Sequence, residues 1–240
     1  MRVRTERIEY DAGGLRAVGH LALPDGDGPR PGVLVCHEGP GIDDNAKRRA
    51  ERLAGELGYV AFALDYIGEG KRLSTMEETM ARLGPLMSDP LATRALGLAG
   101  LEVLRNHERC DPTRLAAIGF CFGGTMALEL ARAGTDLAAV VGFHSGLATA
   151  RPGDAAQITA KVLVCVGAED PIVPPAQRAD FEDEMRAGGV DWAMHLYGRA
   201  AHSFTNPSAG ELGLPGIAYE ERADRRSWAA MVELFAEALG

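Results

Sequence analysis

Apolar runs alternate with helix-like stretches along most of the chain. Continuous apolar runs predict strands that are buried on both faces, at Val33–Cys36, Tyr59–Leu64, 115–119, Leu137–Phe143 and Lys161–Val166, with a last short strand at Asp191–Tyr197. Apolar residues at helical spacing, together with breaks at Gly58, Pro85 and Pro90, predict helices at 44–57, 75–83, 91–107, 122–133, 175–187 and 221–238.

The first residues have a different pattern. Residues 3–10 and 15–23 alternate loosely and flank Asp11-Ala-Gly-Gly14, which predicts an antiparallel hairpin. We therefore expect an α/β fold with a mostly parallel central sheet, helices on both faces and an N-terminal hairpin. No repeat or long linker divides the 240 residues, so the expectation is one domain over 1–240.

Net charge and cysteine content limit the binding partners and the cellular compartment that we expect. The net charge of −9 argues against nucleic acid and anionic membranes, which bind basic surfaces. The charged N-terminus does not look like a secretory signal, and no apolar run approaches the ~20 residues that span a bilayer. The four cysteines have no C-x-x-C spacing, so we expect neither zinc nor disulfides, and a cytoplasmic location.

The strongest chemical motif follows the strand at 115–119. The segment Gly119-Phe120-Cys121-Phe122-Gly123 has the G-x-S-x-G pattern of a nucleophile elbow, with cysteine in the serine position. Its glycines suit a strained strand-to-helix corner, and the start of the next helix favours a thiolate. The alternative is a tight turn with a buried cysteine, since free cysteines are often buried.

A base and an acid follow later strands, at the sheet end where α/β folds bind ligands. His202 lies in the loop after the last strand, and His37 is its competitor because it also follows a strand. Asp170 precedes Pro171, which keeps it out of helical geometry, and Glu169 is the alternative acid. Because Cys121, Asp170 and His202 have the chain order of α/β-hydrolases, we predict a catalytic triad.

Two further groups belong to this prediction. Glu38 directly follows a central strand, so it could reach Cys121 from the neighbouring strand end. A solvated loop acid is the other interpretation of Glu38. Backbone N–H groups of Gly39 and Phe122 are the expected oxyanion hole.

With these residues assembled, the chain resembles the dienelactone hydrolase family of α/β-hydrolases, which includes the carboxymethylenebutenolidases. The resemblance covers nearly the whole chain, and its most specific marks are His37-Glu38, residues 119–124 (Gly-Phe-Cys-Phe-Gly-Gly), residues 167–170 (Gly-Ala-Glu-Asp) and His202-Ser203-Phe204. It implies that Cys121 attacks an ester or lactone carbonyl and forms a thioester, which water hydrolyses. It also implies that Glu38 pairs with the resting thiol.

The chain departs from the family where the substrate carboxylate is held. The family uses two arginines, and this sequence has Asn206 and Glu69 at the matching places. Exchanging an arginine for a carboxylate reverses the local charge. We therefore expect poor activity on dienelactone itself, with Tyr66 and Phe204 as further substrate-binding candidates. Arg72, Arg82 or Arg199 could replace the missing arginines.

The resulting prediction is a cofactor-independent carboxylic ester or lactone hydrolase that acts on a small molecule as a monomer or small homo-oligomer. The same triad could instead serve acyl transfer or peptide cleavage. A non-catalytic binding module on this fold is a third possibility, because fold does not determine function. No H-E-x-x-H or similar cluster indicates a metal site.

Overall fold

A computed structural model describes residues 1–240, apart from the side chain of Leu212. The chain forms two compact units, Met1–Ile118 and Gly119–Gly240, and each is described by itself. Both units are built from strands and helices in alternation, which confirms the predicted α/β class.

The first unit contains the hairpin and the first parallel pair. Its strands are β1 (Val3–Ala12), β2 (Leu15–Pro24), β3 (Arg30–Cys36), β4 (Val60–Ala63) and most of β5 (Cys110–Phe120), in the spatial order β1-β2-β4-β3-β5. β1 and β2 pair antiparallel, from Val3 opposite Pro24 to Ala12 opposite Leu15. Gly13 and Gly14 both have positive φ, as a two-residue hairpin turn requires, so the predicted hairpin is confirmed.

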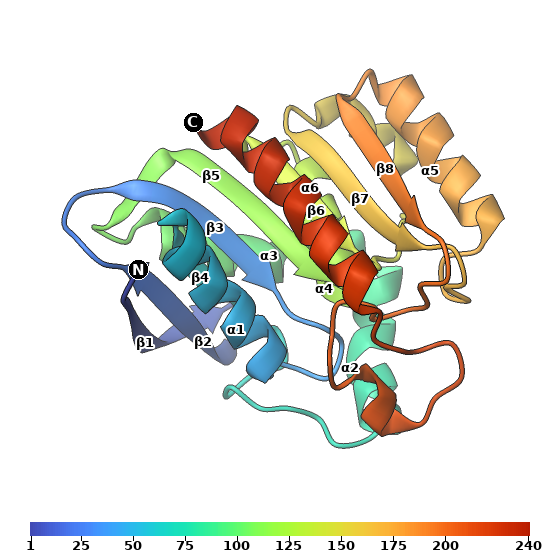
Figure 1. Cartoon of the computed structure of the whole chain (residues 1–240), viewed down its shortest axis with the longest axis horizontal. Helices are drawn as coiled ribbons and strands as arrows, with labels where there is room; N and C mark the ends of the chain where they lie inside the picture. The colour runs from blue at the N-terminus through green and yellow to red at the C-terminus, as the bar shows by residue number, and fades with distance from the viewer. The chain divides into compact units, whose positions relative to one another are not determined.

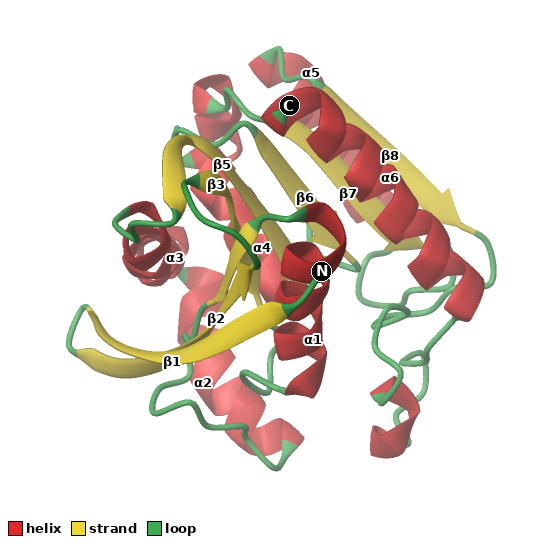
Figure 2. Cartoon of the chain, turned by 60° about the vertical axis from the view of Figure 1, so that its left-hand side comes forward, coloured by secondary structure: helices red, strands yellow, loops and turns green.

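Helices cover both faces of this part of the sheet. α1 (Asp44–Arg52) begins at Asp43, whose carboxylate accepts the Ala46 N–H at 2.9 Å. It continues as a π-helical turn over Leu53–Leu57 and ends at the left-handed Gly58. Figures 1 and 2 show α1 on one face of β3 and β4 and α3 (Pro90–Arg105) on the other.

The predicted break at Pro85 is wrong, because α2 runs unbroken from Met76 to Ser88. A proline inside a helix removes one backbone hydrogen bond, which costs about 3 kcal/mol. A capping box between Thr75 and Glu78 stabilises the first turn, and the buried Leu83 and Leu86 anchor the residues on either side of the proline. Tertiary burial therefore outweighs the local penalty.

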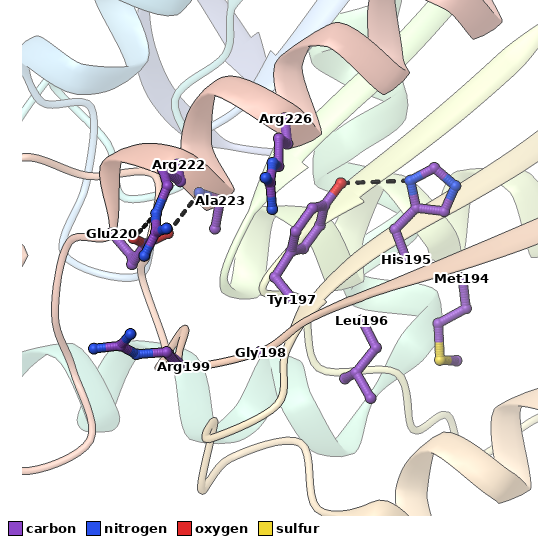
Figure 3. A pocket seen from close by; sticks show the side chains of 10 residues that line it. All are labelled: Met194, His195, Leu196, Tyr197, Gly198, Arg199, Glu220, Arg222, Ala223 and Arg226. Atoms are coloured by element: carbon purple, nitrogen blue, oxygen red, sulfur yellow. Dashed lines mark hydrogen bonds and ion pairs between the residues drawn. The ribbon is translucent and has the colours of Figure 1, made fainter.

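The second unit contains three parallel strands, β6 (Ala139–Phe143), β7 (Lys161–Gly167) and β8 (Trp192–Tyr197). α6 (Glu221–Leu239) covers one face of these strands, and α4 (Phe122–Arg132) and α5 (Pro175–Gly188) lie on the other (Figures 1 and 2). Side chains of β8 alternate accordingly: Trp192 packs against Phe181 of α5, whereas Tyr197 faces the start of α6 (Figure 3).

A buried ionic cluster joins α4 to α5. Arg132 is fully buried and binds both carboxylate oxygens of Glu184, at 2.7 and 2.8 Å. Glu129 and the carbonyl oxygen of Leu147 accept further hydrogen bonds from the same guanidinium. A buried charge needs such complete pairing, so this cluster makes the packing of the two helices specific. Within the described residues, no helix combines the length and the apolar character needed to cross a bilayer.

Candidate active site

Cys121 occupies a strained corner between β5 and α4. Its backbone has φ 54° and ψ −122°, and its N–H donates to the carbonyl oxygen of Phe143 at 3.1 Å. A Cβ at Gly119 would overlap the backbone of Gly123, and one at Gly124 would overlap the side chain of Ser145. Gly119 is therefore required by close backbone approach, as in a nucleophile elbow, and Gly124 leaves room for the side chain of Ser145.

Exposure separates Cys121 from the other three cysteines. Cys121 is half-buried, whereas Cys36, Cys110 and Cys165 are buried, and none of the four forms a disulfide. Burial raises the pKa of Cys110 to about 11 and that of Cys165 to about 12. These thiols stay protonated near neutral pH, so Cys121 is the cysteine placed for chemistry.

His202 and Asp170 form a buried pair. His202 Nδ1 lies 2.8 Å from Asp170 Oδ2, and the other carboxylate oxygen of Asp170 accepts the Ile172 N–H at 2.8 Å. Both side chains are nearly inaccessible, whereas Glu169 is exposed. The carboxylate therefore orients the imidazole and stabilises its cationic form, and Asp170 rather than Glu169 makes this contact.

The electrostatics of His202 connect it to Cys121. Burial lowers the pKa of His202, but the charge of Cys121 and the hydrogen bond and charge of Asp170 together outweigh burial and raise this pKa to about 10. Among the described residues, Nε2 of His202 has no partner with ordinary hydrogen-bond geometry. The effect of Cys121 on this pKa is therefore mainly one of charge, and a proton on His202 at neutral pH is favoured.

One residue of this site was not assigned a role from the sequence. His144, directly after β6, lies beside both Cys121 and the segment that carries His202. Its Nδ1 is 3.2 Å from the backbone N of Cys121, and its Nε2 is 2.8 Å from Thr205 Oγ1. Its ring meets the His202 ring edge to face, with 5.3 Å between the centroids. The only local signal was its position after a predicted strand.

The predicted residues of the first unit form a packed cluster after β3. Tyr66 is fully buried, stacks on His37, and donates its hydroxyl to the backbone carbonyls of His37 and Glu38 at 3.0 and 2.9 Å. Burial lowers the pKa of His37, which keeps that imidazole neutral. Glu38 is 8% exposed, and a Cβ on Gly39 would approach Leu83 Cδ1 to 2.9 Å. A larger residue at position 39 would therefore displace the end of the Leu83 side chain.

Of the other substrate-binding candidates, one is exposed and two are buried. Glu69 is exposed and pairs with Lys71 at 2.5 Å, which lowers its pKa. Asn206 is buried and accepts the Ser208 N–H at 3.0 Å. Phe204 is fully buried between the rings of Tyr197 and His144. Asn206 and Phe204 thus help to shape the loop that follows His202.

A cavity of about 660 Å³ lies between β8 and the start of α6 (Figure 3). Its lining includes three arginines and one glutamate, and consists of Met194, His195, Leu196, Tyr197, Gly198, Arg199, Glu220, Arg222, Ala223 and Arg226. Cys121, Asp170 and His202 are not part of it. Over the described residues, no three His, Cys, Asp or Glu side chains are grouped to hold a metal ion.

The βα architecture and the elbow after β5 define the class as an α/β-hydrolase. The model of the dienelactone hydrolase family matches residues 18–239, and the chain belongs to that family. It is accordingly a hydrolase of esters or lactones.

Individual relatives match along the whole length. "Protein usf" of Aquifex pyrophilus is 28% identical over 243 residues, which cover 98% of this chain and 99% of that protein. A dienelactone hydrolase-like promiscuous phosphotriesterase from metagenomic libraries is 40% identical, with a TM-score of 0.95 and complete coverage of both chains. A solved structure named m3DLH is 46% identical, with a TM-score of 0.95 over 99% of each chain.

Proposed function

We propose that this protein hydrolyses carboxylic esters or lactones with Cys121 as nucleophile, His202 as acid and base, and Asp170 as the orienting group. The observation that carries the proposal is the buried 2.8 Å contact between His202 Nδ1 and Asp170 Oδ2, together with the electrostatic coupling of His202 to Cys121. An elbow cysteine beside such a pair is the arrangement of nucleophilic catalysis.

The proposed reaction begins from a Cys121 thiolate beside a His202 imidazolium. The sulfur attacks the carbonyl carbon, and the oxyanion is stabilised by the N–H of Phe122 at the start of α4, where the helix dipole favours negative charge. Gly39 is the proposed second donor. His202 then protonates the leaving alkoxide, and the C–O bond breaks to leave a thioester.

Water completes the cycle. The neutral His202 accepts a proton from water as the oxygen attacks the thioester carbonyl. The C–S bond breaks, the acid leaves, and the thiolate–imidazolium pair returns. Asp170 stays ionised throughout and keeps Nδ1 of His202 protonated.

The substrate proposed is a small neutral ester or lactone rather than dienelactone. The exposed Glu69 and the buried Asn206 offer no positive charge for a substrate carboxylate. We also propose a cytoplasmic location and a monomer or small homo-oligomer, the former supported by four unpaired cysteines. We propose a phosphotriester as a second substrate class for the same nucleophile, supported by the 40% identity to a promiscuous phosphotriesterase.

The test is a stopped-flow assay with p-nitrophenyl acetate, followed by dienelactone and a phosphotriester. We expect a burst of p-nitrophenol equal to the enzyme concentration in the native protein and in the matched control Cys165→Ala, and none in Cys121→Ala. Rapid turnover of dienelactone would contradict the proposed substrate range. Acetyl transfer to an added amine in preference to water would indicate an acyltransferase, and an unreactive Cys121 without ester turnover would indicate a binding module.

A further inference from the structure

The side chain of His144 has an assignable hydrogen-bond direction at each ring nitrogen. The backbone N–H of Cys121 is shared between the carbonyl oxygen of Phe143, at 3.1 Å, and Nδ1 of His144, at 3.2 Å. An N–H can only donate, so Nδ1 of His144 must accept with its lone pair. A neutral imidazole carries its proton on the other nitrogen, and Nε2–H therefore donates to Thr205 Oγ1 at 2.8 Å. Both nitrogens are used, and the ring is fully buried.

These two bonds join the two catalytic loops. One end of the link is the backbone of Cys121, and the other end is Thr205, three residues after His202. The backbone of His144 is held in turn, because its N–H donates to the carbonyl oxygen of Cys165 in β7 at 2.8 Å. Its φ of 40° is unusual for a residue other than glycine, so surrounding contacts must hold the ring in place.

The same geometry excludes a role for His144 as a second base. A proton on Nδ1 would face the Cys121 N–H, and Nε2 has no lone pair to offer in this tautomer. The ring touches His202 through its edge and Phe204 through a perpendicular contact, with centroids 5.3 and 5.2 Å apart. It is therefore a rigid spacer between the nucleophile and the loop of the base.

We infer that His144 is a positioning residue, which sets the separation of Cys121 and His202 through the chain Cys121 N–H to Nδ1 and Nε2–H to Thr205 Oγ1. This inference rests on the proposed function of those two residues. It differs from that proposal in its consequence: removing the ring nitrogens of His144 should impair the chemical step while substrate binding is retained.

The experiment compares His144→Phe, which keeps an aromatic ring without nitrogens, with His144→Asn, whose Oδ1 can still accept the Cys121 N–H. We expect His144→Phe to lower kcat about 10- to 100-fold, the scale of a misplaced catalytic group, with KM changed less than threefold. His144→Asn should recover part of kcat. Thr205→Val should lower kcat in the native background and have little further effect in His144→Phe, because both changes break one link.

Two further readouts separate positioning from stability and from the function itself. The stability control is Phe181→Leu, which removes core volume in the same unit. It should lower the melting temperature but leave kcat unchanged, when kcat is calculated per active site counted from the burst amplitude. A His144→Phe variant that behaves like Phe181→Leu would overturn the inference. If native protein hydrolyses no ester, the proposed function fails. In that case the rate at which iodoacetamide alkylates Cys121 still tests the role of His144. A slower alkylation in His144→Phe than in native protein supports the positioning role, and an unchanged rate overturns it.

Discussion

The protonation of His202 gives the most direct test of the charge pair. Cys121 and Asp170 act on this imidazole through charge and hydrogen bonding, and together they raise its pKa from 6.5 to about 10 against the opposing effect of burial. That difference corresponds to roughly 5 kcal/mol of preference for the cation, at about 1.4 kcal/mol for each tenfold change. Cys121 is the largest cause that raises it. Cys121→Ser replaces the proposed thiolate by a neutral hydroxyl, so we expect the pKa of His202 to fall by about 2 or more.

The assay is a pH titration of the imidazole nitrogens of ¹⁵N-labelled protein by NMR. In native protein both ring nitrogens of His202 should remain protonated from pH 7 to 9, because the raised pKa lies above that range. In Cys121→Ser the ring should lose its proton at lower pH, and Cys165→Ala should behave like native protein. A native His202 that is neutral at pH 7, or an unchanged midpoint in Cys121→Ser, would refute the charge-pair reasoning.

Three other changes have definite expected outcomes. Asp170→Asn should lower kcat for p-nitrophenyl acetate by about 10²- to 10⁴-fold and lower the pKa of His202, measured by the same kinetics and titration. Glu184→Gln should cost about 3–5 kcal/mol in urea unfolding, because it leaves the buried Arg132 underpaired. Its control Glu182→Gln, in an exposed pair of the same 2.7 Å length on the same helix, should cost less than about 1 kcal/mol, and equal losses would contradict the burial argument. Thr75→Ala should cost about 1 kcal/mol by loss of the α2 cap, and an unchanged unfolding midpoint would contradict that role.

Much of the fold was predictable because strand burial leaves a clear pattern. The apolar runs at 33–36 and 161–166 lie inside β3 and β7. Strands covered on both faces carry almost no polar residues, so a continuous apolar run predicts such a strand. The helix through Pro85 was not predictable. Local rules place a break there, and only the burial of Leu83 and Leu86 in the folded chain offsets it.

Some features of the candidate site were likewise predictable from the sequence, and others were not. The need for Gly119 could be interpreted from the sequence, because it arises from the backbone of the same turn. The choice of Asp170 over Glu169 also followed from a local feature, the proline after it, and it agrees with the contact to His202. The contact of His144 with Thr205 joins residues 61 positions apart, and no short-range pattern encodes it.

The backbone around the site shows why propensity alone could not find it. Cys121, His144 and Ser203 all have positive φ without being glycine, and they follow β5, follow β6 and adjoin His202 respectively. Each such residue costs on the order of 1–3 kcal/mol unless its surroundings hold it. A turn selected only for stability would carry glycine at these three positions. The nucleophile and His144 instead supply side chains that glycine lacks, so the strain occurs where the proposed chemistry needs a side chain held in place.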